Sequence, residues 1–267
     1  MGYAVACMAA LVAGALVSAA YITVFYHRAF AHGGISLRPA VRRFVVLTGP
    51  WVTGIDPKAW ACMHRLHHRH SDGSRDPHSP VNVGVPGVFF AQLRAYERML
   101  SGLTLGKRSY TAVVSDLDFP ISWANRRQLW FLPYVAQIIV SIAIGWAFGA
   151  WLFAACLYLG LMSHPVQGWL VNSFGHAAGY RNFETPDSSR NNLFVAFFVV
   201  GEGLQNNHHY DQDSARFAYR WWEPDLGFLL CRIFQGLGLL SILKDRIAPE
   251  AGPARPAVEP SGASTSA

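Results

Sequence analysis

The 267-residue sequence has few charged residues and few cysteines. Charged residues make up 14% and hydrophobic residues 52%, whereas about a quarter of a typical soluble domain is charged. The four cysteines, Cys7, Cys62, Cys156 and Cys231, show no paired spacing, which argues against a disulfide scaffold and a thiolate zinc module. The net charge of +6 would suit nucleic acid or an anionic membrane surface. The mean hydropathy of +0.20 favours the membrane, so we expect no nucleic-acid partner.

Two long runs lack Asp, Glu, Lys, Arg and His. Residues 3–26 are long enough to cross a membrane as one helix, since about 20 apolar residues suffice. Residues 128–163 are too long for one crossing and predict a helical hairpin with arms at 129–146 and 148–162. The second arm is short, so either it continues past His164 towards Gln167 or the hairpin is only partly inserted. The sequence therefore predicts an all-α integral membrane protein with about three transmembrane helices and a helical cap.

The basic residues predict the orientation. Because a hairpin returns the chain to the side it left, residues 27–127 and those after 164 should share one face. All 22 Lys and Arg residues fall in these two segments, which the positive-inside rule places in the cytoplasm, with the N-terminus outside. A bacterial inner membrane is favoured over the endoplasmic reticulum. A signal peptide would have a basic n-region, which residues 3–26 lack, and a buried core helix would leave the second run unexplained.

Several shorter segments complete the predicted layout. The apolar run 44–51 is too short to span and suits a helix lying in the membrane interface. Residues 72–87 are rich in Asp, Gly, Ser and Pro and predict a loop, followed by an amphipathic helix over about 88–100. We expect one domain over 1–249 and a disordered low-complexity tail over 250–267.

All eleven histidines lie outside the predicted spans, and eight of them cluster. The clusters are HRAFAH with His27 and His32, HRLHH with His64, His67 and His68, NSFGH with His176, and QNNHH with His208 and His209. In the second cluster the helical spacing puts all three imidazoles on one face. On a straight α-helix two residues five apart point about 140° apart, so the first pair fits two different metals or a position across a helix end. The isolated His70, His78 and His164 are interpreted as ordinary histidines.

Eight clustered imidazoles exceed what one metal ion uses and therefore predict two metals. Imidazole alone leaves zinc, copper, nickel and iron open. A structural zinc pair is the alternative, although a closed structural site would not require membrane spans. Acidic residues near the clusters are candidates to accept the free N–H of a ligand histidine. These are Asp72, Asp76, Glu202 and Asp211.

The motifs HRAFAH, HRLHHRHSD…DPHSP, WLVNSFGH and GEGLQNNHH, in this order, resemble the histidine boxes of the membrane-bound fatty acyl desaturases, the acyl-CoA and acyl-lipid family. The resemblance covers about residues 20–245. It implies a mushroom-like protein with a cytoplasmic cap and a centre of two iron ions. The ligands that it implies are His27, His32, His64, His67, His68, His176, His208 and His209.

Two further positions and one segment follow from the same resemblance. Asn172 matches a family residue that reaches one iron through water. Gln205 stands where some members have histidine, and we expect its side chain to hydrogen-bond a water or a ligand histidine. The family also commonly has a span before the one that carries its first box, whereas this chain starts inside that span.

The resemblance implies an O2-dependent desaturase that introduces a cis double bond into a long acyl chain carried on CoA, acyl carrier protein or a lipid. We expect no catalytic residue beyond the metal centre. No CxxC pair, flavin fingerprint or haem motif is present, so a separate electron donor of the ferredoxin, rubredoxin or cytochrome b5 type is expected. A membrane di-iron hydroxylase or oxidative decarboxylase would share the site. A non-enzymatic metal-binding or transport protein should carry charged or histidine residues within its spans, and these spans have none.

Overall fold

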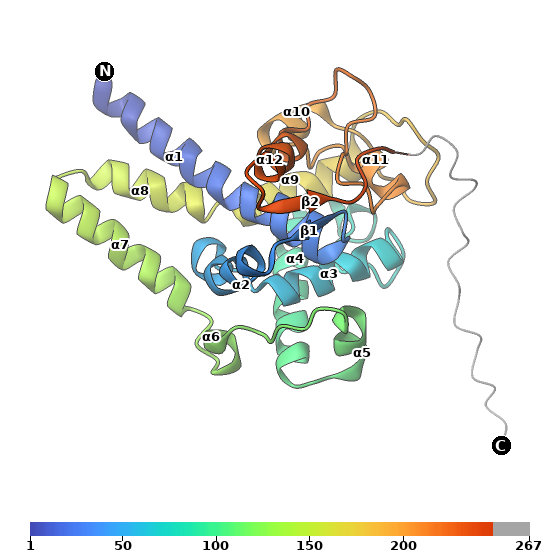
Figure 1. The fold of residues 1–267 in the computed structure, drawn as a ribbon, viewed down its shortest axis with the longest axis horizontal. Helices are drawn as coiled ribbons and strands as arrows, with labels where there is room; N and C mark the ends of the chain where they lie inside the picture. The colour runs from blue at the N-terminus through green and yellow to red at the C-terminus, as the bar shows by residue number, and fades with distance from the viewer. Residues whose placement is uncertain (248–267) are drawn as a thin grey trace.

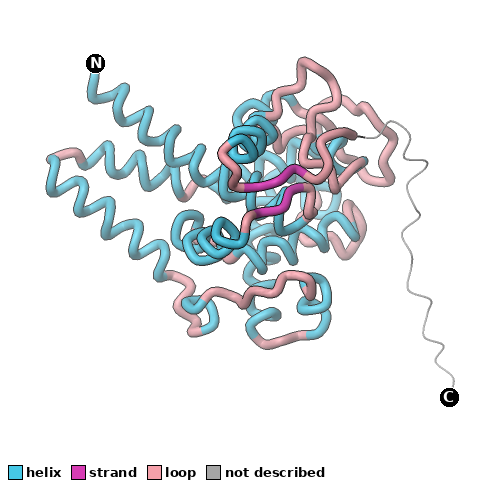
Figure 2. The backbone as a smooth tube through the Cα atoms, in the orientation of Figure 1, coloured by secondary structure: helices cyan, strands magenta, loops and turns pink. Residues whose placement is uncertain are grey.

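The computed structural model describes residues 1–247, and most of its elements are helices (Figures 1 and 2). The first half of the chain contains α1 (Gly2–Ala20), the π-helix η1 (Tyr21–Ala31), β1 (Ile35–Leu37), α2 (Pro39–Thr53), α3 (Pro57–His70), α4 (Pro80–Thr104), α5 (Arg108–Thr111), η2 (Ala112–Val114) and α6 (Trp123–Arg126). The second half contains α7 (Leu132–Phe148), α8 (Trp151–Leu161), α9 (His164–Ala177), α10 (Leu193–Phe198), α11 (Gln205–Tyr210), α12 (Leu226–Gly236) and β2 (Leu240–Ile242). The predicted tail, 250–267, lies outside the described residues, and the boundary of the predicted domain at 249 stays a prediction.

The N-terminal part of the chain is one long apolar helix. Helices α1 and η1 run on without a break as a 30-residue helix, which is long enough to cross a membrane. Its most apolar 18-residue stretch has a mean hydropathy of 2.2. In Figure 1, α1, α7 and α8 project to one side, and the remaining helices form a cap at the inner end of α1. The predicted first span therefore continues beyond residue 26 into the cap.

The predicted hairpin consists of α7 and α8, which turn at Gly149 with φ of 62°. These helices have 17 and 11 residues, fewer than the roughly 20 that a full crossing requires, so the count of three spans stays a prediction. The second arm does not run on towards Gln167, because α8 ends at Leu161 and α9 begins as a separate helix. Helix α8 packs along α1, and the backbones approach closely at Gly14 and Gly160.

Capping residues explain where the helices of the cap begin. Asp56 accepts hydrogen bonds from two backbone N–H groups at the start of α3, and Ser79 accepts one at the start of α4. The predicted loop over 72–87 and helix over 88–100 are therefore wrong in their boundary, because α4 starts at Pro80. Its first turns contain Gly84 in a non-helical conformation (φ 71°, ψ 160°), which kinks the helix.

The prediction of an all-α fold needs one correction. Strands β1 and β2, three residues each, pair antiparallel with Ile35 opposite Ile242. Three residues are too short to show the alternation by which a strand is recognised in a sequence. This pairing fixes the end of the described chain beside the segment that follows His32.

The main apolar core lies within the cap, between η1, α3 and α4, and includes Tyr26, Phe30, Cys62 and Met99. Helix α2 exposes Phe44, Leu47 and Trp51, as expected of the predicted interfacial helix. The histidines His27, His67 and His208 are 0–1% exposed. Because polar side chains are buried only when they have partners, these positions mark the candidate site.

Candidate metal centre

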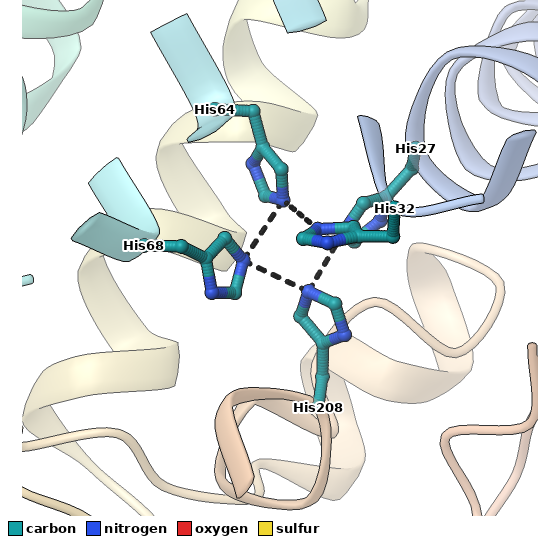
Figure 3. Close-up of side chains that lie close together, drawn as sticks. All are labelled: His27, His32, His64, His68 and His208. Carbon is teal, nitrogen blue, oxygen red and sulfur yellow. Dashed lines mark hydrogen bonds between the residues drawn. The ribbon is translucent and has the colours of Figure 1, made fainter. Parts of the chain in front are cut away.

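Five histidines from three parts of the chain converge on one point (Figure 3). We call them the first histidine group: His27, His32, His64, His68 and His208. The Nε2 atoms of His27 and His208 are 2.9 Å apart, and those of His32 and His64 are also 2.9 Å apart. His68 Nε2 lies 3.0 Å from the Nε2 atoms of both His64 and His208. Helices η1, α3 and α11 therefore direct equivalent ring atoms at a common centre.

These separations fit ligands of one metal ion. With metal–nitrogen bonds of about 2.1 Å, two ligands at a right angle are about 3.0 Å apart, and two ligands at a tetrahedral angle are about 3.4 Å apart. The observed 2.9–3.0 Å matches the right-angle positions of a five- or six-coordinate metal. Such a donor set differs from the closed four-coordinate zinc site that was the structural alternative.

The π-helix explains why His27 and His32 meet. In η1 the backbone N–H of His32 donates to the carbonyl of His27, five residues earlier, at 3.1 Å. This wider hydrogen-bonding pattern brings residues five apart onto one face, whereas in an α-helix they diverge. Of the two expected arrangements, two different metals is wrong, because both rings belong to the first histidine group. The other arrangement, a position across a helix end, is the one observed, since His32 is the C-cap of η1.

A second histidine group consists of His67, His176 and His209, which come from α3, α9 and α11. Their ring centroids are 4.8–5.2 Å apart. Within residues 1–247, the buried Nε2 atoms of His67 and His176 have no hydrogen-bond partner. An unpartnered buried nitrogen costs free energy unless a ligand satisfies it, so this group also fits a metal ion.

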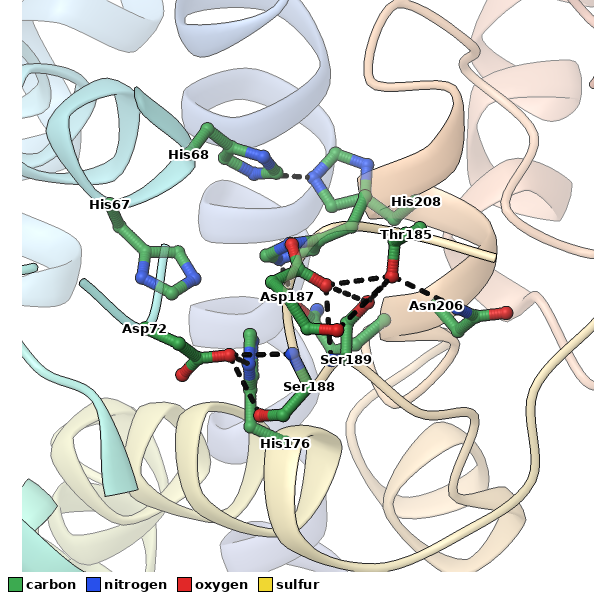
Figure 4. A network of polar contacts seen from close by, with 12 residues as sticks. His67, His68, Asp72, His176, Thr185, Asp187, Ser188, Ser189, Asn206 and His208 are labelled. Carbon is green, nitrogen blue, oxygen red and sulfur yellow. Dashed lines mark hydrogen bonds and ion pairs between the residues drawn. The ribbon is translucent and has the colours of Figure 1, made fainter. Parts of the chain in front are cut away.

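Four carboxylates orient the histidines through the other ring nitrogen. The Nδ1 atoms form these contacts: His27 with Glu202 at 2.6 Å, His67 with Asp76 at 2.9 Å, His176 with Asp72 at 3.2 Å, and His209 with Asp187 at 2.6 Å. Figure 4 shows Asp72 bonded to His176 and Ser188, and Asp187 bonded to Ser189 and Thr185. A carboxylate at Nδ1 leaves the Nε2 lone pair free for a metal.

Three of these carboxylates, Asp72, Asp76 and Glu202, lie where the sequence predicted partners for the histidines. The fourth predicted residue, Asp211, makes an ion pair with Lys244. Asp187 was missed, because it lies 22 residues before its partner His209 and the intervening loop has no periodic pattern. The spacing of the motifs therefore predicted which histidines cluster, but it predicted only three of the four carboxylates that contact them.

Burial sets the protonation of the site. Desolvation lowers the pKa of His64, His68 and His208 well below the usual value, and neighbouring histidines lower it further. Burial raises the pKa of Asp76, but the hydrogen bond and charge of His67 outweigh this effect and hold it at about 2. At neutral pH the imidazoles of His64, His68 and His208 are therefore neutral, which is the form that binds metal, and Asp76 is ionised.

Gln205 lies at the edge of the second histidine group. Its Nε2 donates to the carbonyl of Glu202 at 2.7 Å, which turns Oε1 towards His209 Nε2 at 3.1 Å. Burial lowers the pKa of His209 to about 4 despite Asp187, so its ring is neutral and its proton is on Nδ1. Two lone pairs therefore face each other, as two ligands of one cation would. Asn172 lies nearby in the same cavity and donates to Gln92 at 3.3 Å.

The three isolated histidines occupy different environments. His78 is 2% exposed, and its ring stacks on His67 with centroids 4.6 Å apart. Together with Asp76 these two residues form a third set that could hold a metal. His164 lines the cavity, and its buried Nδ1 has no partner among the described residues. His70 is the last residue of α3, and it belongs to none of the three possible metal-binding sets found among the described residues.

A cavity adjoins the first histidine group at His64 and reaches Gln205, which lies beside His209 of the second group. Its empty volume, including the open mouth, is about 1020 Å3, and His64, His78 and Gln205 form part of its wall. Most of the remaining wall is apolar, with Ile22, Ile55 and Val171 among the lining residues. An apolar wall of this kind suits a flexible hydrocarbon chain.

Comparison with known proteins gives a consistent result. The family model described as fatty acid desaturase matches residues 2–225. The chain is 32% identical over 236 residues to Delta-9 acyl-lipid desaturase 2 of Arabidopsis thaliana, covering 84% of this chain and 70% of the relative. It is 31% identical over 223 residues to the sn-1 stearoyl-lipid 9-desaturase of Anabaena variabilis, covering 84% and 78%.

A relative named for a different activity is the hex-5-enoyl-[acyl-carrier protein] acetylenase of Moorena producens, which is 31% identical over 233 residues, covering 82% of this chain and 71% of the relative. The family model and these relatives agree with the four histidine motifs. The chain therefore belongs to the fatty acid desaturase family of membrane-bound oxidoreductases.

Proposed function

We propose that this protein is an O2-dependent fatty acyl desaturase that introduces a cis double bond into a long acyl chain at a di-iron centre. The observation that carries the proposal is the position of the two histidine groups, whose Nε2 atoms converge beside an apolar cavity. The eight histidines of these groups are the proposed ligands, and no further catalytic residue is proposed.

The reaction removes one hydrogen from each of two neighbouring CH2 groups. When bound, the two irons would supply the redox chemistry by which O2 takes two electrons from the acyl chain, two from the donor and two protons from solvent, giving one alkene and two waters. The electron donor is a separate protein of the ferredoxin, rubredoxin or cytochrome b5 type.

The residues of the chain position the reactants. Glu202, Asp72, Asp76 and Asp187 hold four of the imidazoles in one orientation. The cavity wall excludes water from the acyl chain and fixes the carbon atoms that face the histidine groups. Specificity for one double-bond position follows from how far the chain enters the cavity.

The proposed location is the cytoplasmic face of a membrane, in a bacterial inner membrane, with three spans. The long helix Gly2–Ala31 supports one crossing by length and composition. The acyl substrate is carried on CoA, acyl carrier protein or a membrane lipid.

Fatty-acid profiling of an expressing host tests the function. Expression of the wild type should produce a new cis-monounsaturated fatty acid, and mass spectrometry of this product gives the position of its double bond. A host expressing His209→Ala, which lacks one proposed ligand, is the matched control and should show the profile of the empty host. Hydroxylated, shortened or acetylenic products would assign the chain to a different oxidation. Bound iron with an unchanged lipid profile would favour a metal-binding role.

A further inference from the structure

The cavity extends along α9, away from the histidine groups. Along α9, the lining residues His164, Gly168, Val171 and Asn172 form one stripe at helical spacing. His164 and Asn172 are eight residues apart, which corresponds to about 12 Å along the helix axis. Asn172 lies at the histidine end, so the first turn of α9 marks the far end of the cavity.

Gln167 crosses this far end from α9 to α1. It lines the cavity, and its Nε2 donates to the backbone carbonyl of Ala15 at 3.3 Å and to Ser163 Oγ at 2.6 Å. Ala15 lies one turn farther from the histidines than Ala19, which also lines the cavity. Both amide hydrogens therefore have partners, and the side chain is held across the gap between the two helices.

Beyond Gln167 the helices leave no space for a chain. A Cβ atom placed on Gly14 would lie 2.7 Å from the carbonyl oxygen of Leu157. A Cβ atom placed on Gly160 would lie 2.2 Å from the carbonyl oxygen of Leu11. Because the α1 and α8 backbones are in direct contact here, Gln167 forms the last wall of the cavity that a side-chain change can move.

The chemistry of the acyl substrate decides whether its methyl end or its carrier end lies beside Gln167. An acyl carrier is large and polar, and a closed space between apolar helices cannot enclose it. The methyl end of the chain needs only apolar contacts and a wall. None of the cavity-lining residues in the described part of the chain is Lys or Arg, so this end also offers no cation to a phosphate group.

We propose that Gln167 closes the methyl end of the acyl cavity and sets the longest chain that the enzyme accepts. The inference rests on the proposed function, because it takes the cavity as the acyl site. Replacement by a smaller side chain lengthens the cavity, and added bulk at Ala19 shortens it.

Chain-length profiles of four variants test this stop. Gln167→Ala should raise the preferred length by about two carbons, with the ratio of longer to shorter product rising on the order of 10-fold, since one methylene in an apolar pocket changes discrimination by that factor or more. Gln167→Met keeps the length of the side chain without its bridge and should retain the wild-type profile. Ala19→Val should shift the preference to shorter chains.

Gln137→Ala is the matched control. Gln137 also joins two helices, donating from α7 to the carbonyl of Trp51 at 2.8 Å, but it does not line the cavity. Its removal should leave the chain-length profile unchanged. A shift in this variant equal to that of Gln167→Ala would overturn the assignment of the stop.

Two readouts distinguish a failure of the chain-length stop at Gln167 from a failure of the proposed desaturase function. The first is the product profile of hosts supplied with saturated fatty acids of 14 to 20 carbons. The second is displacement of a fluorescent polyene fatty acid from purified protein by the same series. Products or binding with the same profile in wild type, Gln167→Ala and Ala19→Val contradict the stop alone. If the wild type makes no unsaturated product, the proposed function fails, and the binding profiles still decide whether Gln167 limits chain length.

Discussion

Burial and a carboxylate partner distinguish a histidine of the two groups, such as His67, from a histidine outside them, such as His70. His67 is 1% exposed and held by Asp76, whereas His70 lies three residues later at the end of α3. Replacing His67, His68 or His209 by Ala removes a proposed ligand and should abolish product and lower the iron content. His70→Ala should leave both nearly unchanged. Iron per chain, measured on purified protein, checks this division, and it is wrong if His70→Ala loses as much iron as His67→Ala.

Gln205 tests how the second histidine group is completed. The sequence predicts hydrogen bonding to a water or a histidine, with most iron retained and about a 10-fold loss of turnover in Gln205→Ala. The facing lone pairs of Gln205 Oε1 and His209 Nε2 favour the amide oxygen as a ligand. On this geometry Gln205→Ala should lose about one iron per chain, and Gln205→His should keep two. Full iron content in the Ala variant would restore the role predicted from the sequence.

The residues of the site were predictable where spacing carries the information. Positions 64, 67 and 68 share one face of an α-helix, so the motif HRLHH by itself predicts that their rings lie close together. The motif does not predict that His67 joins the second histidine group while His64 and His68 join the first. The partners do not follow from spacing, because Asp187 reaches His209 through the irregular chain between α9 and α11. His78 gave no signal either, since a lone histidine in a loop is usually not a ligand.

Among the structural elements, composition predicted the apolar helices, and the capping residues Asp56 and Ser79 explain where α3 and α4 begin. Two features had no compositional trace. The π-helix η1 differs from an α-helix in its hydrogen bonds rather than in its residue types. The early start of α4 depends on the Ser79 cap, and Gly84 interrupts the first turns. Ser and Gly both also suit a loop, so neither residue revealed the helix in the sequence.

The packing of α1 against α8 gives a prediction for an element. A methyl group on Gly160 would contact the carbonyl of Leu11 at 2.2 Å, so Gly160→Ala should force the helices apart and lower the free energy of unfolding by about 1–3 kcal/mol. Gly236→Ala is the matched control, because among the described residues a Cβ there has no neighbour within 4 Å. Thermal unfolding in detergent measures both. Equal midpoints for the two variants would contradict close packing of α1 on α8.

The charges of the whole molecule predict its topology in the membrane. Both Lys107 and Arg246 lie in the segments that the positive-inside rule assigns to the cytoplasm. In Lys107→Cys and Arg246→Cys, a membrane-impermeant thiol reagent should label neither residue in intact cells and both after permeabilisation. The wild type is the control, because Cys7, Cys62 and Cys231 are buried and Cys156 is half-buried. Labelling of one position from each side would refute the predicted hairpin.

The proposed metal content belongs to the whole molecule, in which two histidine groups, one of five imidazoles and one of three with an amide beside it, would hold two irons next to the cavity. Elemental analysis of purified protein that desaturates its substrate tests this claim most directly. We predict about two irons per chain, because eight clustered imidazoles exceed the ligands of one metal. Stoichiometric zinc in active protein, or a single iron per fully active chain, would contradict the account.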